Sequence, residues 1–393
     1  MDNFAIIQAL CRAAMTDPTP AVRKQIERLR DQLQAQGDKK SAAALTRILR
    51  AADRTDEMAP SRITQSRTQF AGEQLTAKTL PPVDRETSTS LADIIFPTQL
   101  SSEAPLFNRA LTEGIEVLLR EWENAEALIA VGAPPPSSCL FFGAPGTGKT
   151  RLALWIAHQL GLPVVLARLD SLVSSFLGTS ARNISNLFSF ANRYQCILLL
   201  DEFDAIAKLR DDPHEVGEIK RVVNALMQHL DVRHALGLTV GITNHPQLLD
   251  RAIWRRFDAQ IEIPKPDYDV RRAIAEQYMP PIEAPASHIA MLAWLTDSCS
   301  GAEVEMLVRA YKKEIAINPN ASREFLHMLR RFATLNTGRV TEARKTLLLG
   351  NEDHLLQTLR SDIQLKLEDL GLIAGHDKST VSRRLKQSAK GAN

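Results

Sequence analysis

The sequence predicts an α/β fold: a five-stranded parallel sheet with helices on both faces, followed by an all-helical region. Between residues 139 and 263, short apolar runs alternate with helix-length amphipathic segments, which is typical of strands buried in a parallel sheet. Beyond Pro264 the strand pattern stops and helical periodicity continues to the end of the chain. The predicted strands cover residues 139–142, 164–166, 197–200, 238–242 and 261–263.

Composition divides the 393 residues into five parts. Residues 1–52 have helical periodicity interrupted at Gly37-Asp38, which indicates a helical hairpin that serves either packing and oligomerisation or the reception of a substrate. Residues 53–90 are rich in Thr, Ser, Gln, Arg and Pro, which indicates a flexible linker. The other parts are an α/β part, a helical part and a C-terminal helical region, at residues 91–266, 267–338 and 339–393.

The bulk composition excludes several classes of protein. A formal net charge of +2, from 48 basic and 46 acidic residues, is too small for a whole-molecule nucleic-acid binder, so such a role would need a local patch. The four cysteines form no CxxC pair, which disfavours disulfides and zinc sites and favours a reducing interior. No apolar stretch approaches the roughly 18 residues of a membrane span. We therefore predict a cytoplasmic protein without membrane contact.

Residues 143–150 match the phosphate-binding pattern GxxxxGK[ST], directly after an apolar run and directly before a helical segment. Its glycines let backbone N–H groups converge on a polyphosphate, and the following helix adds its positive N-terminal end. We expect Lys149 to reach the β- and γ-phosphates and the Thr150 hydroxyl to coordinate Mg²⁺. The expected nucleotide contacts are Gly143, Ala144, Pro145, Gly146, Thr147, Gly148, Lys149, Thr150 and Arg151.

Two carboxylates follow the apolar run at 197–200. A buried strand that ends in acids delivers them to the carboxyl edge of the sheet, where ligands of open α/β sheets bind. We expect Asp201 to hold Mg²⁺ and Glu202 to polarise the water that attacks the γ-phosphate, because phosphoryl transfer depends mainly on positioning and charge stabilisation.

Polar residues also follow the run at 238–242. Asn244 is placed to hydrogen-bond the attacking water or the γ-phosphate and so to report the nucleotide state. Arg255 and Arg256 are candidates for arginine fingers that reach the γ-phosphate of a neighbouring subunit. Two adjacent arginines taken alone are more often a solvated surface pair.

Together these motifs resemble the AAA clade of the AAA+ ATPases, over about residues 91–335. The resemblance rests on the phosphate loop, Asp-Glu-Phe-Asp at 201–204, Thr-Asn-His-Pro at 243–246, Leu-Asp-Arg-Ala-Ile at 249–253 and Arg-Arg-Phe-Asp at 255–258. Ser-Gly-Ala-Glu-Val at 300–304 resembles the start of the lid helix of that clade. The adjacent arginines are similar to those of spastin and katanin, whereas FtsH separates them with Pro-Gly, so either one could be the main finger.

The resemblance implies an Mg²⁺-dependent ATPase with an α/β P-loop NTPase core, a helical lid at 267–338, and a homo-oligomeric ring, usually a hexamer, with active sites between subunits. It implies that Ile94 lines the adenine pocket. Phe176, Leu177 and Gly178 resemble the central-pore loop with which such ATPases grip a threaded polypeptide, and residues 205–217, after Asp204, would form a second pore loop. The alternative for Phe176 and Leu177 is simple packing under a loop.

The segment at 367–387 has the pattern helix, glycine turn, helix, and it resembles a DNA-binding helix-turn-helix. Gly371 fits a tight helix crossing, Gly375 makes the turn and Val381 points inward. His376 and Arg384 depart from the pattern, because the first position is usually apolar and the second usually buried. A basic tail that packs on the lid is the alternative. The residues that would meet a DNA groove are Ser379, Thr380, Ser382 and Arg383.

Three functions follow from these features. The first is a ring ATPase that remodels, unfolds or translocates protein substrates. The chain has no HExxH or GxSxG motif, so degradation would need a separate protease, and the layout resembles bacterial ATPases that pair with a subtilisin-like protease in defence against phage or plasmids. The second is a DNA-associated ATPase that remodels nucleoprotein complexes. The third, a scaffold that barely hydrolyses ATP, is disfavoured by the intact Glu202.

Overall fold

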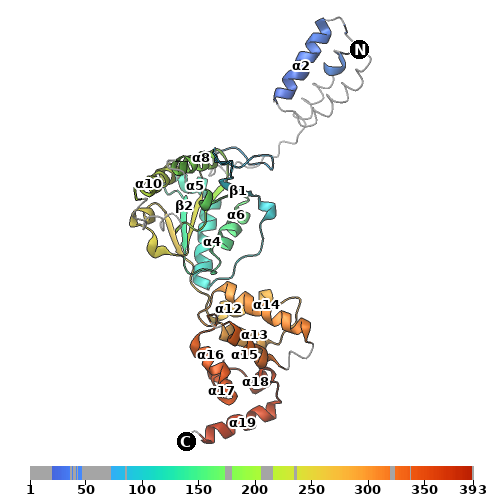
Figure 1. Cartoon of the computed structure of the whole chain (residues 1–393), viewed down its shortest axis with the longest axis vertical. Helices are drawn as coiled ribbons and strands as arrows, with labels where there is room; N and C mark the ends of the chain where they lie inside the picture. The colour runs from blue at the N-terminus through green and yellow to red at the C-terminus, as the bar shows by residue number, and fades with distance from the viewer. Residues whose placement is uncertain are drawn as a thin grey trace. The chain divides into compact units, whose positions relative to one another are not determined.

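The computed structural model divides the chain into two compact units, Met1–Ser66 and Arg67–Asn393 (Figure 1). In the first unit, α2 (Pro20–Ala35) buries Ile26 and Leu33, and the helical residues 43–46 bury Leu45. The structure describes residues 20–35, 38, 41, 43–46, 72–84, 86–172, 179–204, 216–233, 237–318, 324–336 and 338–391.

The second unit contains a six-stranded sheet in the order β1-β3-β4-β5-β2-β6. All five predicted strands are present and pair in parallel with their neighbours. The prediction of a five-stranded sheet needs one correction, because β1 pairs antiparallel with β3 and adds an edge strand. The four residues of β1 include the charged Asp93, so they do not form the continuous apolar run from which the other strands were predicted. The strands are β1 (Ala92–Ile95), β2 (Ser138–Phe142), β3 (Val164–Ala167), β4 (Ile197–Leu200), β5 (Thr239–Thr243) and β6 (Ala259–Glu262).

Helices cover both faces of the sheet, as β4 illustrates. Ile197 and Leu199 pack with α4 and α6 on one face, and Leu198 and Leu200 pack with α7, α8 and α10 on the other. Alternation of side chains along a strand explains why four consecutive apolar residues are all buried. The helices are α4 (Arg109–Glu123), α5 (Ala125–Ala130), α6 (Lys149–Leu160), α7 (Leu169–Leu172), α8 (Thr179–Arg193) and α10 (Val216–Arg233), with short turns η1 (Pro97–Gln99), η3 (Pro246–Leu248) and α11 (Arg251–Trp254).

Part of the predicted linker packs on this α/β part. Leu75 is buried, and Glu73 forms a parallel bridge with Tyr194 after α8. The buried carboxylate of Asp84 accepts a hydrogen bond of 2.7 Å from the Asn183 side chain. Residues 72–84 and 86–90 are therefore held by specific contacts, although their composition is that of a loop.

The helices after the sheet share one hydrophobic core, which contains Trp294, Leu329, Leu359 and Ile373. The two helical parts distinguished by sequence, 267–338 and 339–393, therefore pack as one body. Among the described residues, no helix is long and apolar enough to cross a membrane. Figure 1 shows these helices grouped together: α12 (Tyr268–Tyr278), α13 (Ala286–Leu295), α14 (Gly301–Ile317), α15 (Phe325–Leu335), α16 (Glu342–Leu349), α17 (Glu352–Asp362), α18 (Leu367–Ala374) and α19 (Lys378–Gly391).

Candidate active site

The predicted phosphate loop connects β2 to α6, so it has the expected strand–loop–helix context. Its glycines, Gly143, Gly146 and Gly148, all have positive φ. At Gly143 a Cβ atom would lie 2.3 Å from the backbone oxygen of Ile263, so a side chain has no room there. The loop therefore depends on glycine for conformation and for close backbone approach.

Lys149, the first residue of α6, turns back onto the loop. Its ammonium donates hydrogen bonds to the carbonyl oxygens of Gly143, at 2.9 Å, and Ala144, at 2.7 Å. Burial lowers the pKa of Lys149, and the nearby charges of Asp201 and Asp204 oppose that shift. A buried cation that faces a concave loop is suited to bind an anion.

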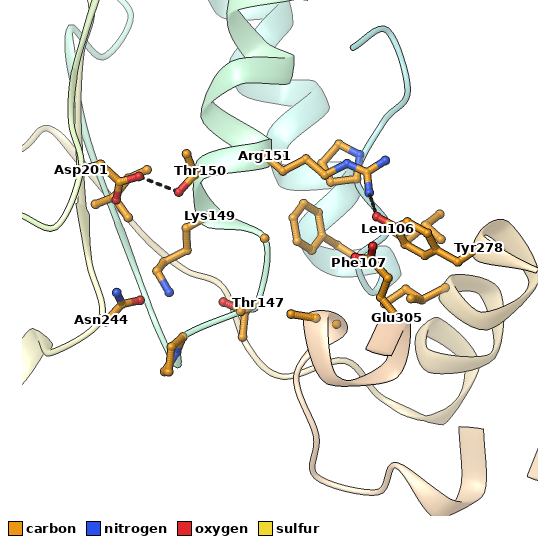
Figure 2. A pocket seen from close by; sticks show the side chains of 18 of the residues that line it. Leu106, Phe107, Thr147, Lys149, Thr150, Arg151, Asp201, Asn244, Tyr278 and Glu305 are labelled. Atoms are coloured by element: carbon orange, nitrogen blue, oxygen red, sulfur yellow. Dashed lines mark hydrogen bonds between the residues drawn. The ribbon is translucent and has the colours of Figure 1, made fainter. Parts of the chain in front are cut away.

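Thr150 and Asp201 meet although 51 positions separate them in the sequence. The Thr150 hydroxyl donates a hydrogen bond of 2.7 Å to Oδ2 of Asp201, which follows β4 directly (Figure 2). A hydroxyl and a carboxylate are oxygen ligands of the kind that Mg²⁺ takes in phosphate sites. This pair of residues therefore fits the predicted metal position.

Glu202 stands next to this pair in an uncommon backbone conformation, with φ of 53°. Its N–H donates to Oδ1 of Asp201 at 2.8 Å, and its side chain is exposed to the cavity. A non-glycine residue with positive φ is unfavourable, and such residues cluster at functional sites. The turn after β4 thus holds both carboxylates at the carboxyl edge of the sheet.

Asn244 directly follows β5 and faces the same cavity. The buried carboxylate of Asp204 accepts hydrogen bonds from the Asn244 backbone N–H, at 3.3 Å, and from the Thr243 hydroxyl, at 3.2 Å. Asp204 therefore links the end of β4 to the end of β5 and positions Asn244. Its place in the Asp-Glu-Phe-Asp motif was visible in the sequence, but its contact with the next strand was not.

A cavity of about 360 Å³ brings these residues together. One wall comes from the α/β part and the other from α12 and α14, which sequence reasoning did not assign to the site (Figure 2). The sequence around α12 shows helical periodicity. This periodicity predicts a helix, but it does not indicate that the helix faces a ligand. The lining residues not predicted from the motifs include Leu106, Phe107, Ile274, Gln277, Tyr278, Ala302 and Glu305.

Ile94, which was expected at the adenine pocket, does not line this cavity. It lies in β1, which three strands separate from β2 and the phosphate loop. Its neighbour Asp93 forms a double hydrogen bond with Arg168, with both distances 2.8 Å. The apolar residues beside the phosphate loop are instead Leu106 and Phe107, in the segment before α4.

Polar contacts join the α/β part to the helices at the rim of the cavity. Arg151 donates a hydrogen bond of 2.7 Å to the Tyr278 hydroxyl on α12 (Figure 2). It also donates to Glu103, at 3.2 Å. The N–H of Ala302 at the start of α14 donates to the carbonyl oxygen of Gly146 in the phosphate loop, at 3.1 Å. The phosphate loop and the helical part are therefore in direct contact.

The two candidate arginine fingers have different surroundings, and neither lines the cavity. Arg256 forms an ion pair of 2.8 Å with Asp231 on α10. Arg255 ends α11, is exposed, and has no ion-pair partner among the residues that the structure describes. Arg256 is therefore held by its own subunit, whereas Arg255 is available at the surface.

The predicted pore-loop residues Phe176, Leu177 and Gly178 lie outside the described residues, as does the segment 205–215 of the second predicted pore loop. The description resumes at α8, which begins at Thr179 and packs against α10.

The C-terminal segment has the predicted order of helix, glycine turn and helix, in α18 and α19. Gly375 ends α18 with φ of 69°, and a Cβ atom on Gly371 would lie 2.6 Å from the carbonyl oxygen of His376. Val381 is fully buried, as predicted. Ser379 and Arg383 are exposed on α19, and Thr380 and Ser382 are half-buried.

The two departures from the helix–turn–helix pattern have a structural explanation in α17. Arg384 forms ion pairs with Glu352, at 2.8 Å, and Asp353, at 2.7 Å. His376 lies 3.5 Å from the same Glu352. Carboxylates on α17 therefore accompany both departures, the histidine at the usually apolar position and the arginine at the usually buried one.

Comparison with known proteins agrees with the phosphate-loop geometry. Residues 139–265 match the family model described as "ATPase family associated with various cellular activities (AAA)". The chain is 43% identical over 150 residues to an uncharacterized AAA family ATPase, y4kL, of Sinorhizobium fredii, covering 38% of this chain and 46% of that protein. It is 34% identical over 208 residues to a proteasome-activating nucleotidase of Methanothermobacter thermautotrophicus, covering 51% and 50%.

The chain thus spans about half the length of the curated relatives it matches. Among solved structures, it is similar to the AAA domain of FIGL-1 in complex with ADP, with 26% identity and a TM-score of 0.44 over 53% of this chain and 73% of that one. From the matched family and the phosphate-loop geometry, we conclude that the chain contains an AAA ATPase domain.

Proposed function

We propose that the chain is an Mg²⁺-dependent ATPase that binds and hydrolyses ATP in the cavity between the α/β part and α12 and α14. The observation that carries this proposal is the convergence of Lys149, the Thr150–Asp201 pair, Glu202 and Asn244 on one cavity. These groups come from the ends of two strands, β4 and β5, and from the start of α6, and each has the chemistry that phosphoryl transfer requires.

In this proposal, Lys149 exchanges its loop carbonyl oxygens for phosphate oxygens. Thr150 and Asp201 would hold Mg²⁺, which would supply positive charge next to the phosphates. The Glu202 carboxylate accepts a hydrogen bond from the attacking water, and the Asn244 amide orients that water. The hydrogen bond from Glu202 N–H to Oδ1 of Asp201 holds the Asp201 carboxylate, which would bind the metal, while the exposed Glu202 carboxylate faces the cavity.

Two substitutions test this assignment. Lys149→Ala should abolish ATP binding, and Glu202→Gln should bind ATP but hydrolyse it at least about 100-fold more slowly, because a positioned general base contributes on that order. Glu262→Gln, an exposed carboxylate on β6 outside the cavity, is the matched control. Binding is measured by calorimetry and turnover by phosphate release. Micromolar ATP affinity in Lys149→Ala, or the parent rate in Glu202→Gln, would contradict the proposal.

We further propose that the active form is a homo-oligomer, in the manner of an AAA hexamer, and that it acts on proteins in the cytoplasm. The resemblance to the AAA clade supports the ring, and relatives named proteasome-activating nucleotidases support a protein substrate. The buried free thiols of Cys139, Cys196 and Cys299 suit a reducing compartment. A separate subtilisin-like protease partner, and a role in defence against phage or plasmids, remain part of this proposal on the resemblance alone.

The protein-handling role is tested at Phe176. Casein, used as an unfolded probe, should stimulate ATP hydrolysis of the wild type. Phe176→Ala should lose this stimulation, whereas Phe176→Tyr should retain it, because an aromatic ring contacts a threaded chain with little sequence preference. Equal stimulation of the wild type and Phe176→Ala would argue against a grip by this residue.

The C-terminal geometry supports DNA binding as a second function. The observation that favours it is α19, which buries Val381 while it exposes Ser379, Arg383 and Lys386. Ion pairs with α17 hold Arg384, so the basic charge left at the surface is on the side of Arg383 and Lys386. A helix with this division of faces suits a groove lined by phosphates.

Fluorescence anisotropy with a labelled DNA duplex tests this second function. The wild type should bind with an affinity that falls as salt rises, and Arg383→Ala combined with Lys386→Ala should weaken binding and flatten the salt dependence. Arg109→Ala combined with Lys313→Ala removes the same charge from exposed sites elsewhere and should have little effect. Equal binding by both double variants would exclude α19 as the DNA contact.

A further inference from the structure

The first turn of α6 directs three successive side chains to different parts of the site. Lys149 turns back onto the phosphate loop, and Thr150 reaches Asp201. Arg151 points away from Asp201, toward Tyr278 on α12 (Figure 2). Successive residues of a helix are about 100° apart around its axis, so neighbours in sequence face different sides. The guanidinium of Arg151 therefore stands at the rim of the cavity, beside α12.

Arg151 contacts both sides of the cavity. Its Nη1 donates a hydrogen bond of 2.7 Å to the Tyr278 hydroxyl, and its guanidinium carbon lies 6.0 Å from the centroid of the Tyr278 ring. Its Nη2 donates to Oε2 of Glu103, at 3.2 Å. The Arg151 side chain is 32% exposed and that of Glu103 is 67% exposed, so water weakens the ion pair. The short bond from the charged donor to Tyr278 is therefore the stronger of the two contacts.

Tyr278 connects this bond to the helical wall, which we define as α12 and α14. The ammonium of Lys312 on α14 donates hydrogen bonds to the carbonyl oxygens of Tyr278, at 3.0 Å, and of Pro280. Ile274 of α12 and Val304 of α14 belong to one hydrophobic core. Both helices line the cavity. Because α12 and α14 are fixed to each other, a bond that holds Tyr278 holds the whole helical wall.

The helical wall also meets the α/β part at two other places. The N–H of Ala302 donates to the carbonyl oxygen of Gly146 at 3.1 Å, and Nε2 of Gln277 donates to Glu103 at 3.2 Å. Both donors are neutral, and both bonds are longer than the one between Arg151 and Tyr278. A molecule in the cavity touches residues of both sides, so it loses contacts whenever the helical wall moves away from the phosphate loop.

We propose that Arg151 is a positioning residue: through its hydrogen bond to Tyr278, it holds the helical wall against a bound nucleotide and slows the release of that nucleotide. This inference rests on the proposed function, since it assumes that a nucleotide binds in this cavity. Loss of the bond lets the helical wall separate more often, and each separation removes contacts from the nucleotide. The dissociation rate therefore rises, while the association rate changes less, because weakened contacts act mainly on dissociation.

Stopped-flow release of methylanthraniloyl-labelled ADP tests the inference. Tyr278→Phe removes only the hydroxyl and should speed release about 5-fold, with an association rate within about 2-fold of the wild type. Arg151→Met removes the charged donor and should speed release at least as much, whereas Arg151→Lys keeps a charged donor and should be intermediate. Tyr194→Phe is the matched control, because its ring also lies beside an arginine, Arg193, at 5.4 Å, but outside the cavity. It should release the probe at the rate of the wild type.

The double variant Arg151→Met with Tyr278→Phe separates one shared bond from two independent structural defects. If the residues act through one bond, the double variant should release the probe no faster than Arg151→Met alone, whereas independent effects would multiply. Multiplied effects would overturn the inference, as would release from Tyr278→Phe at the rate of the wild type. Failure of the wild type to bind ADP at all would instead overturn the proposed function.

Discussion

Gly143 shows how strictly one position of the phosphate loop is determined. Its φ of 143° is rarely adopted by L side chains, and the carbonyl oxygen of Ile263 occupies the space of a Cβ atom. That carbonyl belongs to backbone fixed by the hydrogen bond from Ile263 N–H to Phe142, at 2.8 Å. The clash therefore cannot be relieved by turning a side chain.

Gly143→Ala should lower the free energy of unfolding by about 2 kcal/mol or more, because backbone strain and steric overlap act together. Urea unfolding followed by circular dichroism measures the change. Gly114→Ala is the matched control: Gly114 lies in the middle of α4, and a Cβ atom there would meet no other group within 4 Å, so alanine should raise stability by about 0.5–1 kcal/mol. Equal stability of the two variants would contradict this account of the loop.

At the scale of elements, His288 on α13 connects α14, α15 and α18 in the helical part of the chain. The imidazole stacks on Phe325 of α15 with ring centroids 3.9 Å apart. Its Nε2 lies 3.3 Å from the carbonyl oxygen of Leu372 on α18, and its Nδ1 lies 3.0 Å from the Tyr311 hydroxyl on α14. Since a carbonyl only accepts, Nε2 carries the proton and Nδ1 accepts from Tyr311. The neutral imidazole therefore satisfies both neighbours.

Burial lowers the pKa of His288 to about 4, against an ordinary value of 6.5, and the Leu372 carbonyl opposes this shift. Between these values the unfolded chain binds the proton that the folded chain excludes, so stability is greatest above pH 6.5 and falls as the pH drops toward 4. The total loss is about 3 kcal/mol. Urea unfolding at pH 7.5 and 5.0 should show about 2 kcal/mol of this loss in the wild type and a smaller loss in His288→Gln.

His354→Gln removes an exposed histidine from α17 and is the control for that substitution. It should keep the pH dependence of the wild type. An unchanged pH dependence in His288→Gln would show that other groups cause the acid sensitivity of the lid.

At the scale of the whole molecule, the different surroundings of the two arginines lead to a prediction about assembly. Arg255 is exposed without an ion-pair partner among the described residues, and Arg256 is paired with Asp231. If Arg255 acts on the γ-phosphate of a neighbouring subunit, Arg255→Ala should reduce turnover by about 1,000-fold or more, the usual effect of an arginine finger. Arg256→Ala should have the smaller effect.

Mixing variants distinguishes action in trans from action within one chain. Arg255→Ala keeps Glu202 but lacks the arginine, and Glu202→Gln keeps Arg255 but lacks the carboxylate, so each variant should be nearly inactive alone. In the proposed ring, mixing the two variants would create interfaces with an intact Glu202 on one side and an intact Arg255 on the other, so the mixture should hydrolyse ATP faster than the sum of its components. A rate equal to that sum would place the arginine outside the neighbouring site.

The strands and the catalytic motifs were predictable because local sequence specifies them. Ile197–Leu200 is apolar at every position, and acids follow at once, so the strand and the position of Asp201 at its carboxyl edge can both be predicted. The edge strand β1 was missed because its four residues have no clear strand pattern in the sequence. It becomes a strand by pairing with β3. Ile94 was expected at a base pocket from its resemblance to a motif, while the strand order separates it from the phosphate loop.

The sequence by itself determined the parallel strands, the phosphate loop, the two carboxylates after β4 and the glycines of the C-terminal turn, since each depends on residues close together in the chain. Only the tertiary structure decided which segments complete the cavity, because Phe107, Gln277 and Glu305 reach it through packing between distant helices. The same holds for the difference between Arg255 and Arg256, which depends on a carboxylate of α10. Long-range contacts of this kind leave no periodic signal in the sequence, so they can be identified only from the three-dimensional structure.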